Sequence, residues 1–306
     1  MTEFAVYLVT IAGIWAMLGI SLNLQYGVAG LVNLGHVAFF MLGAYTSAIL
    51  VAILGLPIGV GMIAGAGAAA LFGVLMALPA AKLQQDYWGI STLAVAEIVR
   101  IVFLNTRLGE AYVGEAFGIS DIPRPLRETL GAQGYTLADY NLFYMLFVLA
   151  CLALTYVMAA WLAAKPIGRA LKALREGDEV PSALGKRVSG LRMRVMASGG
   201  AIAGLAGALF AHYNAYISPE YFLPLETFII WAMVVLGGAG NFFGVLVGTF
   251  IIQVIYNSSR FLVPLLGIDA QLLGSMRMIV IALLIIGVVM YMPQGLVPER
   301  RRRYDR

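Results

Sequence analysis

Glu97 and Arg100 are charged residues within an otherwise apolar stretch. They lie three residues apart, so on a helix they share one face and can neutralise each other. Inside a bilayer, charged groups are costly and mark functional positions by default. Two interpretations stay open for this pair: an ion pair that locks a helix near a membrane surface, and a polar contact for a solute that crosses the bundle.

Few other side chains are of a type that could bind a metal, form a disulfide or catalyse a reaction. His36 and His212 are far apart, and the single Cys151 has no partner for an internal disulfide, so we expect neither a metal site nor a cofactor. His-Glu-x-x-His and Gly-x-Ser-x-Gly motifs are both missing from the sequence, which argues against an intramembrane enzyme with catalytic residues. The candidate polar residues of a mostly apolar pathway are Asn33, His36, Tyr45, Thr92, Glu97, Arg100 and Asn241.

Composition places these residues in a membrane protein. The chain has 306 residues, of which 61% are hydrophobic and 12% charged, whereas soluble domains carry roughly 25% charged residues. No Lys, Arg, Asp or Glu occurs between Phe4 and Ala81, a length sufficient for several spans of ~20 residues. The apolar runs lack strand alternation, so we predict an all-α polytopic membrane protein.

The apolar runs predict nine helices, and residues 25–36 add either a tenth crossing or a re-entrant segment, so we expect nine or ten spans. Glycine-rich breaks at 27–30 and 237–241 interrupt the two halves, and paired breaks of this kind are typical of a transporter's binding region. Glycines four residues apart, at 55 and 59, 61 and 65, 200 and 204, and 240, 244 and 248, predict close helix packing. The predicted helices lie near 4–24, 37–54, 58–80, 88–104, 141–163, 195–216, 222–239, 242–258 and 275–292.

Charge distribution predicts the topology. Residues 165–194 hold eight Lys or Arg against three acidic residues, so the positive-inside rule makes this segment cytoplasmic. The four arginines at 300–303 make the C-terminus cytoplasmic as well, whereas the acidic loop 105–140 faces the periplasm. An even number of crossings must then separate the two basic segments, so 222–258 crosses twice. The net charge of +4 reflects this topology rather than nucleic-acid binding.

Residues 166–179 form a distinct amphipathic pattern within the basic segment. Ile167, Ala170, Leu171 and Leu174 fall on one side of a helix. Pro166 suits its first turn and Gly177 its end. A short helix of this shape between membrane spans can dock into a groove of a cytoplasmic motor domain. The other interpretation is a solvated helix at the membrane interface.

Residues 165–190 resemble the ATPase-coupling loop of the branched-chain amino-acid ABC permeases, in particular the high-affinity M-type subunit. Stretches at 27–45, 86–100, 216–220, 235–241 and 293–296 resemble further signatures of that family in the expected order. Asn33 stands where a serine is frequent, and Pro181-Ser182 departs from an alanine-rich stretch. The coupling residues that the resemblance implies are Ile167, Gly168, Arg169, Leu171, Leu174, Arg175, Glu176, Asp178, Leu184 and Gly185.

The resemblance implies one transmembrane permease domain over 1–306 in the bacterial inner membrane. Its implied partners are a second permease of the related H-type, two cytoplasmic ABC ATPases and a periplasmic substrate-binding protein, although a homodimer stays open. The sequence has no Gly-x-x-x-x-Gly-Lys-Ser/Thr phosphate loop, so ATP hydrolysis is expected on separate subunits.

The scarcity of fixed charges along the apolar runs also bears on the substrate. It suits a small zwitterion with an aliphatic side chain or a neutral amide, because a charged solute needs partners inside the bundle. We therefore expect import of branched-chain or related amino acids, with urea and short amides as alternatives. An autonomous ion-coupled secondary transporter is the competing class of function.

Overall fold

The computed structural model describes residues 2–80, 85–106, 118–258 and 270–299. Every regular element in these ranges is a helix, and the β pairing found there is one isolated bridge between Ile119 and Ile217. The predicted all-α fold is confirmed. The arginines at 300–303 and residues 107–117 of the predicted periplasmic loop lie outside the described ranges.

Within the described residues, six helices are long and apolar enough to cross a membrane: α1 with its π-helical extension η1, α3, α4, α6, α9 and α13. The shorter apolar helices are α2 with η2, α10 and α11. In chain order the elements are α1 (Thr2–Asn23), η1 (Leu24–Val28), α2 (Val37–Ala48), η2 (Ile49–Ile53), α3 (Ile58–Ala80), α4 (Gln85–Asn105), α5 (Arg127–Ala132), α6 (Leu137–Ala164), α7 (Pro166–Arg175), α8 (Glu179–Ala183), α9 (Val188–Asn214), the 3-10 turn η3 (Pro219–Phe222), α10 (Pro224–Gly237), α11 (Phe242–Ser258) and α13 (Ala270–Tyr291).

Each predicted apolar run overlaps one of these helices, but α9 begins earlier than expected. It starts at Val188 rather than near 195 and includes Arg192 and Arg194. Arg192 Nη2 donates to both carboxylate oxygens of Asp178, at 2.9 and 2.7 Å. This ion pair lets a buried arginine occupy the first turns of a helix, which the apolar pattern alone does not indicate.

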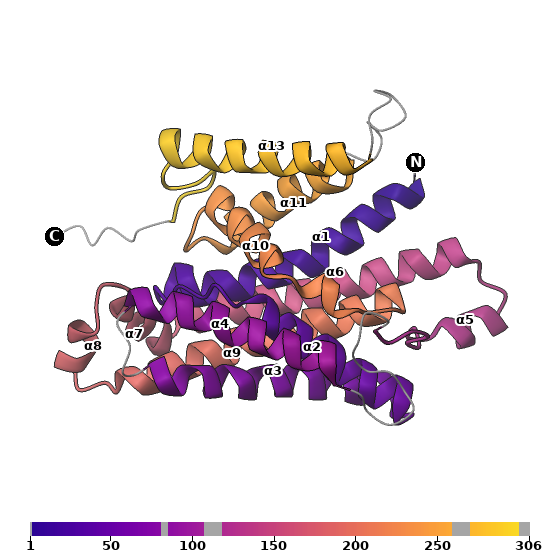
Figure 1. The fold of residues 1–306 in the computed structure, drawn as a ribbon, viewed down its shortest axis with the longest axis horizontal. Helices are drawn as coiled ribbons and strands as arrows, with labels where there is room; N and C mark the ends of the chain where they lie inside the picture. Colours follow the sequence, from indigo (N-terminus) through magenta and orange to yellow (C-terminus); the bar gives the residue numbers. More distant parts are fainter. Residues whose placement is uncertain (1, 81–84, 107–117, 259–269, 300–306) are drawn as a thin grey trace.

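Most of the long helices run between two opposite ends of the molecule (Figure 1). The α7 end holds α7, α8 and the last described residues, while the α5 end holds α5 and the start of α1. Near the α5 end, Ser47 of α2 bonds His212 of α9 at 2.9 Å, and His212 Nδ1 lies 2.6 Å from the Pro123 carbonyl oxygen. The predicted basic loop and the residues just before the basic tail therefore share one end.

Glycines bring α2, α3 and α9 into backbone contact at the centre of the bundle. A Cβ atom at Gly204 would lie 2.5 Å from Ala69 Cβ and 2.7 Å from the Gly65 carbonyl oxygen, and one at Gly43 would collide with Gly204. Small residues permit this approach between membrane helices. The packing prediction is confirmed for Gly65 and Gly204, but it is wrong for Gly55 and Gly59, where an added Cβ meets no atom of the described residues within 4 Å.

Two helices begin inside the bundle rather than at its ends. Residues 29–36 form a non-helical link from η1 to α2, and 215–223 lead into α10 with only the η3 turn. The starts of α2 and α10 meet: Val37 N donates to Thr227 Oγ1 at 3.1 Å, and Trp231 Nε1 donates to the Asn33 carbonyl oxygen at 3.0 Å. This is the arrangement of paired discontinuous helices found in transporters.

We expect Gly204→Val to destabilise the bundle, because the larger side chain must push apart the backbones of α2, α3 and α9. Overpacking of this kind costs about 1–3 kcal/mol. Thermal unfolding of the detergent-purified protein should shift to lower temperature. Gly67→Val on α3 is the matched control, since a Cβ at Gly67 meets no atom of the described part of the chain within 4 Å. Equal unfolding temperatures for the two variants would contradict the packing role of Gly204.

Candidate functional site

The helix α7 turns the chain sharply after the long helix α6. Lys165 is in an extended conformation and Pro166 occupies the first turn. Gly168, Leu171 and Leu174 are buried, Ile167 is half-buried and Arg169 is exposed. A Cβ at Gly168 would collide with the backbone of Ala163. The predicted amphipathic helix is confirmed, and its glycine is required by the tight corner with α6.

The basic last turn of α7 binds the end of the described chain. Lys172 Nζ lies 2.6 Å from Glu299 Oε1, and Arg175 Nη1 lies 3.0 Å from Glu299 Oε2. Arg175 Nη1 also donates to the Gly27 carbonyl oxygen at 2.5 Å. One guanidinium therefore joins α7 to the C-terminal segment and to η1. Glu299 is absent from the sequence prediction, and its place before the arginine run was the only signal for it.

Lys172, Arg175 and Glu299 form an ion cluster, and both glycine-rich breaks lie against it. Gly30 has a φ of 74°, and a Cβ there would lie 2.9 Å from Arg175 Cα. Gly240 has a φ of 88°, and a Cβ there would lie 2.8 Å from Glu299 Oε2. Gly240 N also donates to Asn23 Oδ1 at 2.8 Å. The two breaks, separated by most of the chain, thus converge on the last turn of α7.

The electrostatics of Glu299 reflect its two cationic partners. Burial by itself raises the pKa of the Glu299 carboxyl, but hydrogen bonds from Lys172 and Arg175, together with their charges, outweigh burial and hold the pKa below its ordinary value of 4.5. The carboxylate is therefore the form that the folded protein prefers.

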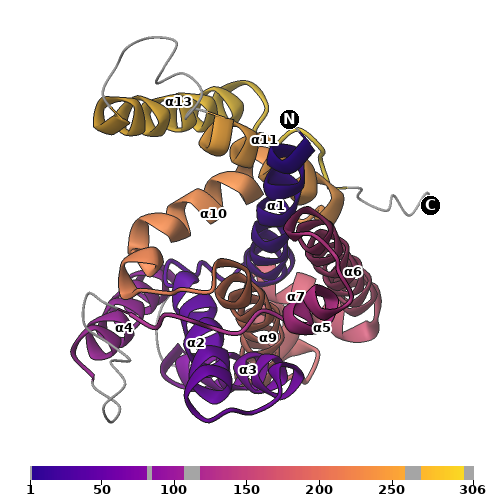
Figure 2. The ribbon, with the colours of Figure 1, turned by 90° about the vertical axis from the view of Figure 1, so that its right-hand side faces the viewer.

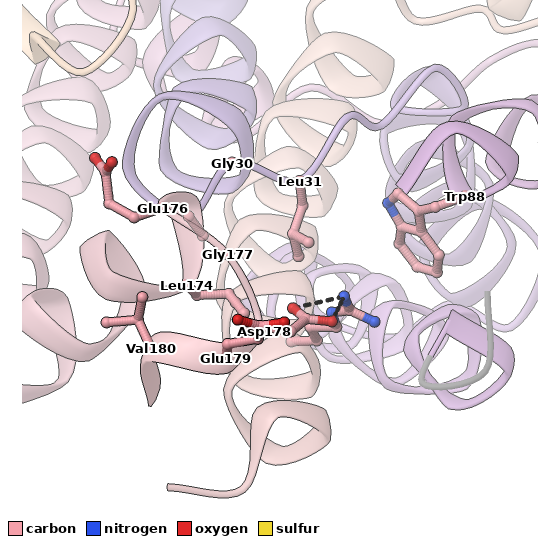
Figure 3. Close-up of a pocket in the computed structure, with 11 residues that line it drawn as sticks. Gly30, Leu31, Trp88, Leu174, Glu176, Gly177, Asp178, Glu179 and Val180 are labelled. Atoms are coloured by element: carbon pink, nitrogen blue, oxygen red, sulfur yellow. Dashed lines mark hydrogen bonds and ion pairs between the residues drawn. The ribbon is translucent and has the colours of Figure 1, made fainter. Parts of the chain in front are cut away.

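A cavity of about 400 Å³ lies beside α7 and α8. Figure 3 shows Leu174 and the α8 residues on one side of it and the Trp88 indole of α4 on the other. Asp178, held by Arg192, lies between them. The cavity joins the α7 end of the bundle to the first glycine-rich break, because Gly30 and Leu31 also line it.

The outer surface of the α7 end combines charge with exposed apolar side chains. Arg169 and Glu176 are exposed, Gly185 ends α8 with a φ of 67°, and the Leu184 side chain next to it is 68% exposed. Large apolar side chains exposed beside charged ones are typical of a surface that another protein covers. The predicted coupling residues thus divide into a buried set that fixes α7 and an exposed set that is free to contact a partner.

A second polar cluster lies inside the bundle. Asn33 Nδ2 donates to Gln25 Oε1 at 2.8 Å, and His36 Nδ1 lies 3.2 Å from the same oxygen. All three side chains are fully buried. Gln25 is absent from the sequence prediction because an apolar helix gives no sign that its last turn is a π-helix facing residues 33–36. Thr92 Oγ1 accepts a hydrogen bond from Leu34 N at 3.0 Å and holds the same segment.

The remaining candidate pathway residues lie apart from this cluster. Arg100 Nε donates to Glu97 Oε2 at 2.9 Å, so the predicted ion pair forms on α4. Tyr45 is fully buried against Phe103, with ring centroids 4.6 Å apart. Asn241 Oδ1 accepts from Phe243 N and Gly244 N at the start of α11, which is a capping role at the α7 end. A pathway role for these residues stays a prediction.

Comparison with known proteins shows which protein family the chain belongs to. The family described as branched-chain amino acid transport system / permease component matches residues 4–289. The chain belongs to this family of ABC transporter permeases.

Named relatives cover nearly the whole chain. The high-affinity branched-chain amino acid transport system permease protein LivM of Escherichia coli (strain K12) is 33% identical over 95% of this chain and 69% of its own length. The probable branched-chain amino acid transport permease protein LivM of Methanocaldococcus jannaschii is 28% identical over 94% and 91%. The LivH permease protein of Salmonella typhimurium is 25% identical over 94% and 92%. No solved structure matches the chain.

We expect Glu299→Gln to destabilise the protein by about 1 kcal/mol near pH 7, the scale of partly exposed ion pairs. Because the folded-state pKa of Glu299 is lowered, its stabilisation is fully present above the ordinary pKa and is lost as the pH falls through the lowered one. Thermal unfolding of wild type and variant should therefore differ near pH 7 and converge below 4.5.

The matched control is Glu3→Gln, an exposed carboxylate at the other end of the bundle. Glu3→Gln should unfold at the same temperature as wild type near pH 7, because an exposed surface carboxylate contributes little to stability. A difference between wild type and Glu299→Gln that persists unchanged into acid would show that the Glu299 charge contributes nothing.

Proposed function

We propose that this chain is a transmembrane permease subunit of an ATP-driven importer in the bacterial inner membrane, and that it moves branched-chain or related amino acids by alternating access. Family membership and the names of the LivM and LivH relatives support the substrate class. The observation that carries the mechanism is the joint contact of Arg175 with Gly27, Gly30 and Glu299, because it ties the coupling helix to the interrupted helices.

In this proposal the α7 end faces the cytoplasm, since it carries the basic segment 165–194. The chain crosses the membrane nine times within one permease domain over 1–306. The nine crossings are α1 with η1, residues 29–53, α3, α4, α6, α9, residues 215–237, α11 and α13. The start of α1 lies at the opposite end, which puts the N-terminus in the periplasm and the C-terminus in the cytoplasm (Figure 1).

The exposed face of α7 and α8 suits a cytoplasmic ABC ATPase. A short helix with an apolar stripe and flanking charges docks into a groove of its partner, and exposed Val180 and Leu184 extend the apolar contact. A second, H-type permease would complete a heterodimer with two ATPases, and a periplasmic binding protein would deliver substrate at the α5 end. The occurrence of both LivM and LivH relatives supports the heterodimer.

The mechanism follows from the ion cluster. Closure of the ATPase dimer pushes on α7, and its last turn moves with Glu299 and the Gly27 carbonyl. Gly30 and Gly240 hold positive φ angles at the two breaks, where backbone rotation is least hindered. The motion reaches the starts of α2 and α10, which meet inside the bundle, and shifts the subunit from outward-facing to inward-facing.

Co-purification tests the docking surface. Wild-type tagged chain should recover ABC ATPases from its native membranes, whereas Gly168→Val, Arg169→Glu and Glu176→Lys should release them, because they disturb the α6–α7 corner or reverse exposed charges. Arg127→Glu, an exposed position at the α5 end, should retain them. A chain that recovers no ATPase and alone accumulates leucine in liposomes under an ion gradient would be a secondary carrier instead.

A second experiment tests the ion cluster. In the reconstituted complex, Arg175→Ala should lower leucine uptake about tenfold, or ~1.4 kcal/mol, while ATP hydrolysis continues, since docking remains but the link to Gly27 and Glu299 is lost. Lys186→Ala removes an exposed positive charge from the same segment and should transport normally. Parallel loss of ATP hydrolysis and uptake in Arg175→Ala would instead make Arg175 part of the docking surface. Uptake of urea or short amides without leucine would change the substrate class.

A further inference from the structure

A second cavity, of about 290 Å³, lies between α1, α9, α10 and α11. Figure 2 shows α10 passing between the group of α2, α3, α4 and α9 and the group of α11 and α13, with α1 beside it. The cavity contains none of the seven pathway residues predicted from the sequence. Its lining includes one carboxylate, three side-chain amides and several aromatic rings, among them Trp15, Phe40, Phe210, Glu226, Gln253 and Asn257.

Glu226 is a half-buried carboxylate in the first turn of α10. Among the described residues it forms no ion pair and accepts no side-chain hydrogen bond. The positive charge that acts on Glu226 electrostatically is that of Arg277 on α13. The Arg277 guanidinium, however, lies 3.6 Å from the centroid of the Tyr256 ring and donates to the Tyr256 carbonyl oxygen at 3.2 Å. The start of a helix tolerates a negative charge, yet it supplies no counter-ion. An ammonium group in the cavity would supply one.

Aromatic rings form an apolar wall near this carboxylate. The Trp15 and Phe40 centroids lie 6.2 Å apart, those of Phe40 and Phe210 lie 5.1 Å apart, and those of Phe210 and Tyr221 lie 6.0 Å apart. Such rings offer contact area to an aliphatic side chain, and their faces also attract an ammonium group.

A chain of amides orients a hydrogen-bond donor in the cavity. Asn257 Nδ2 donates to Gln253 Oε1 at 2.8 Å, which fixes the direction of the Gln253 amide. The Gln253 oxygen is thereby occupied, and Gln253 Nε2 makes no hydrogen bond to the described residues. The free amide donor is a partner for a carboxylate oxygen.

We propose that this cavity holds an α-amino acid in transit through the permease. Glu226 binds the ammonium group, Gln253 Nε2 binds the carboxylate, and Trp15, Phe40 and Phe210 contact an aliphatic side chain. The volume of about 290 Å³ lies at the lower limit of small-molecule sites, roughly 300–1,000 Å³, which suits a compact ligand. The proposal rests on the proposed function and deepens it, since urea and neutral amides have no ammonium group for Glu226.

Transport by the complete reconstituted complex, with binding protein, partner permease and ATPases, tests the site. Glu226→Gln should lower uptake of radiolabelled L-leucine on the order of tenfold, because the charge-assisted bond to the ammonium is lost. ATP hydrolysis stimulated by leucine-loaded binding protein should persist, since α7 is unchanged. Glu220→Gln, an exposed carboxylate just before α10 that does not line the cavity, is the matched control and should transport normally.

A competition experiment with the wild-type complex covers the case in which Glu226→Gln fails to assemble. Binding of radiolabelled leucine is measured without the periplasmic protein, against 3-methylbutylamine, which keeps the ammonium group, and 4-methylpentanoate, which keeps the carboxylate. The amine should displace leucine at lower concentration than the acid. Equal displacement, stronger displacement by the acid, or no displaceable leucine would overturn the site.

Different results would contradict the amino-acid site at Glu226 and the permease function on which it rests. Leucine uptake by the wild type together with undiminished uptake by Glu226→Gln would overturn the site and leave the amino-acid permease intact. A wild-type complex that imports no amino acid would overturn the proposed function, and the amino-acid site with it.

Discussion

The arrangement of this permease depends on one guanidinium. Arg175 donates to the Gly27 carbonyl oxygen and to Glu299, and it lies against Gly30. Gly27 lies within the π-helix η1 at the end of the first span, where the regular α-helical backbone bonding is interrupted. A charged donor satisfies this carbonyl, and a carboxylate balances the donor. The coupling helix, the first glycine break and the C-terminal segment are thereby held as one unit at the α7 end.

Inside the bundle, neutral side chains satisfy the backbone groups that the helix breaks leave without partners. Two helices start inside the apolar core, so their first backbone N–H groups and the preceding carbonyls need partners there. Thr227 accepts from Val37 N, Trp231 donates to the Asn33 carbonyl, and Gln25 joins Asn33 to His36. Neutral groups suit this depth because they carry no charge into the bilayer. The charges of the α7 end and the amides of the core thus support the same pair of interrupted helices.

Much of the fold could be read from the sequence because bilayer physics leaves few alternatives. Apolar runs must be helical in lipid, and the nine predicted runs each overlap an observed helix. The prediction was weakest where a side chain depends on a distant partner. Arg192 lies in α9 because Asp178 neutralises it, and a run of basic residues gives no sign of this. Gly55 and Gly59 have the spacing of packing glycines, but no atom of the described residues lies within 4 Å of a Cβ placed at either one.

The sequence by itself determined the class of protein, the amphipathic helix α7 and the Glu97–Arg100 ion pair, because each depends on composition or on residues within a few positions along one helix. Only the tertiary structure decided that Glu299 meets Arg175, that Gln25 meets Asn33 and His36, and that Glu226 shares a cavity with Trp15 and Gln253. Glu299 meets partners on a distant segment of the chain, Glu226 lines one cavity with residues of α1 and α11, and Gln25 meets its partners across a helix break. Local periodicity carries no information about such contacts, because helix packing brings these residues together.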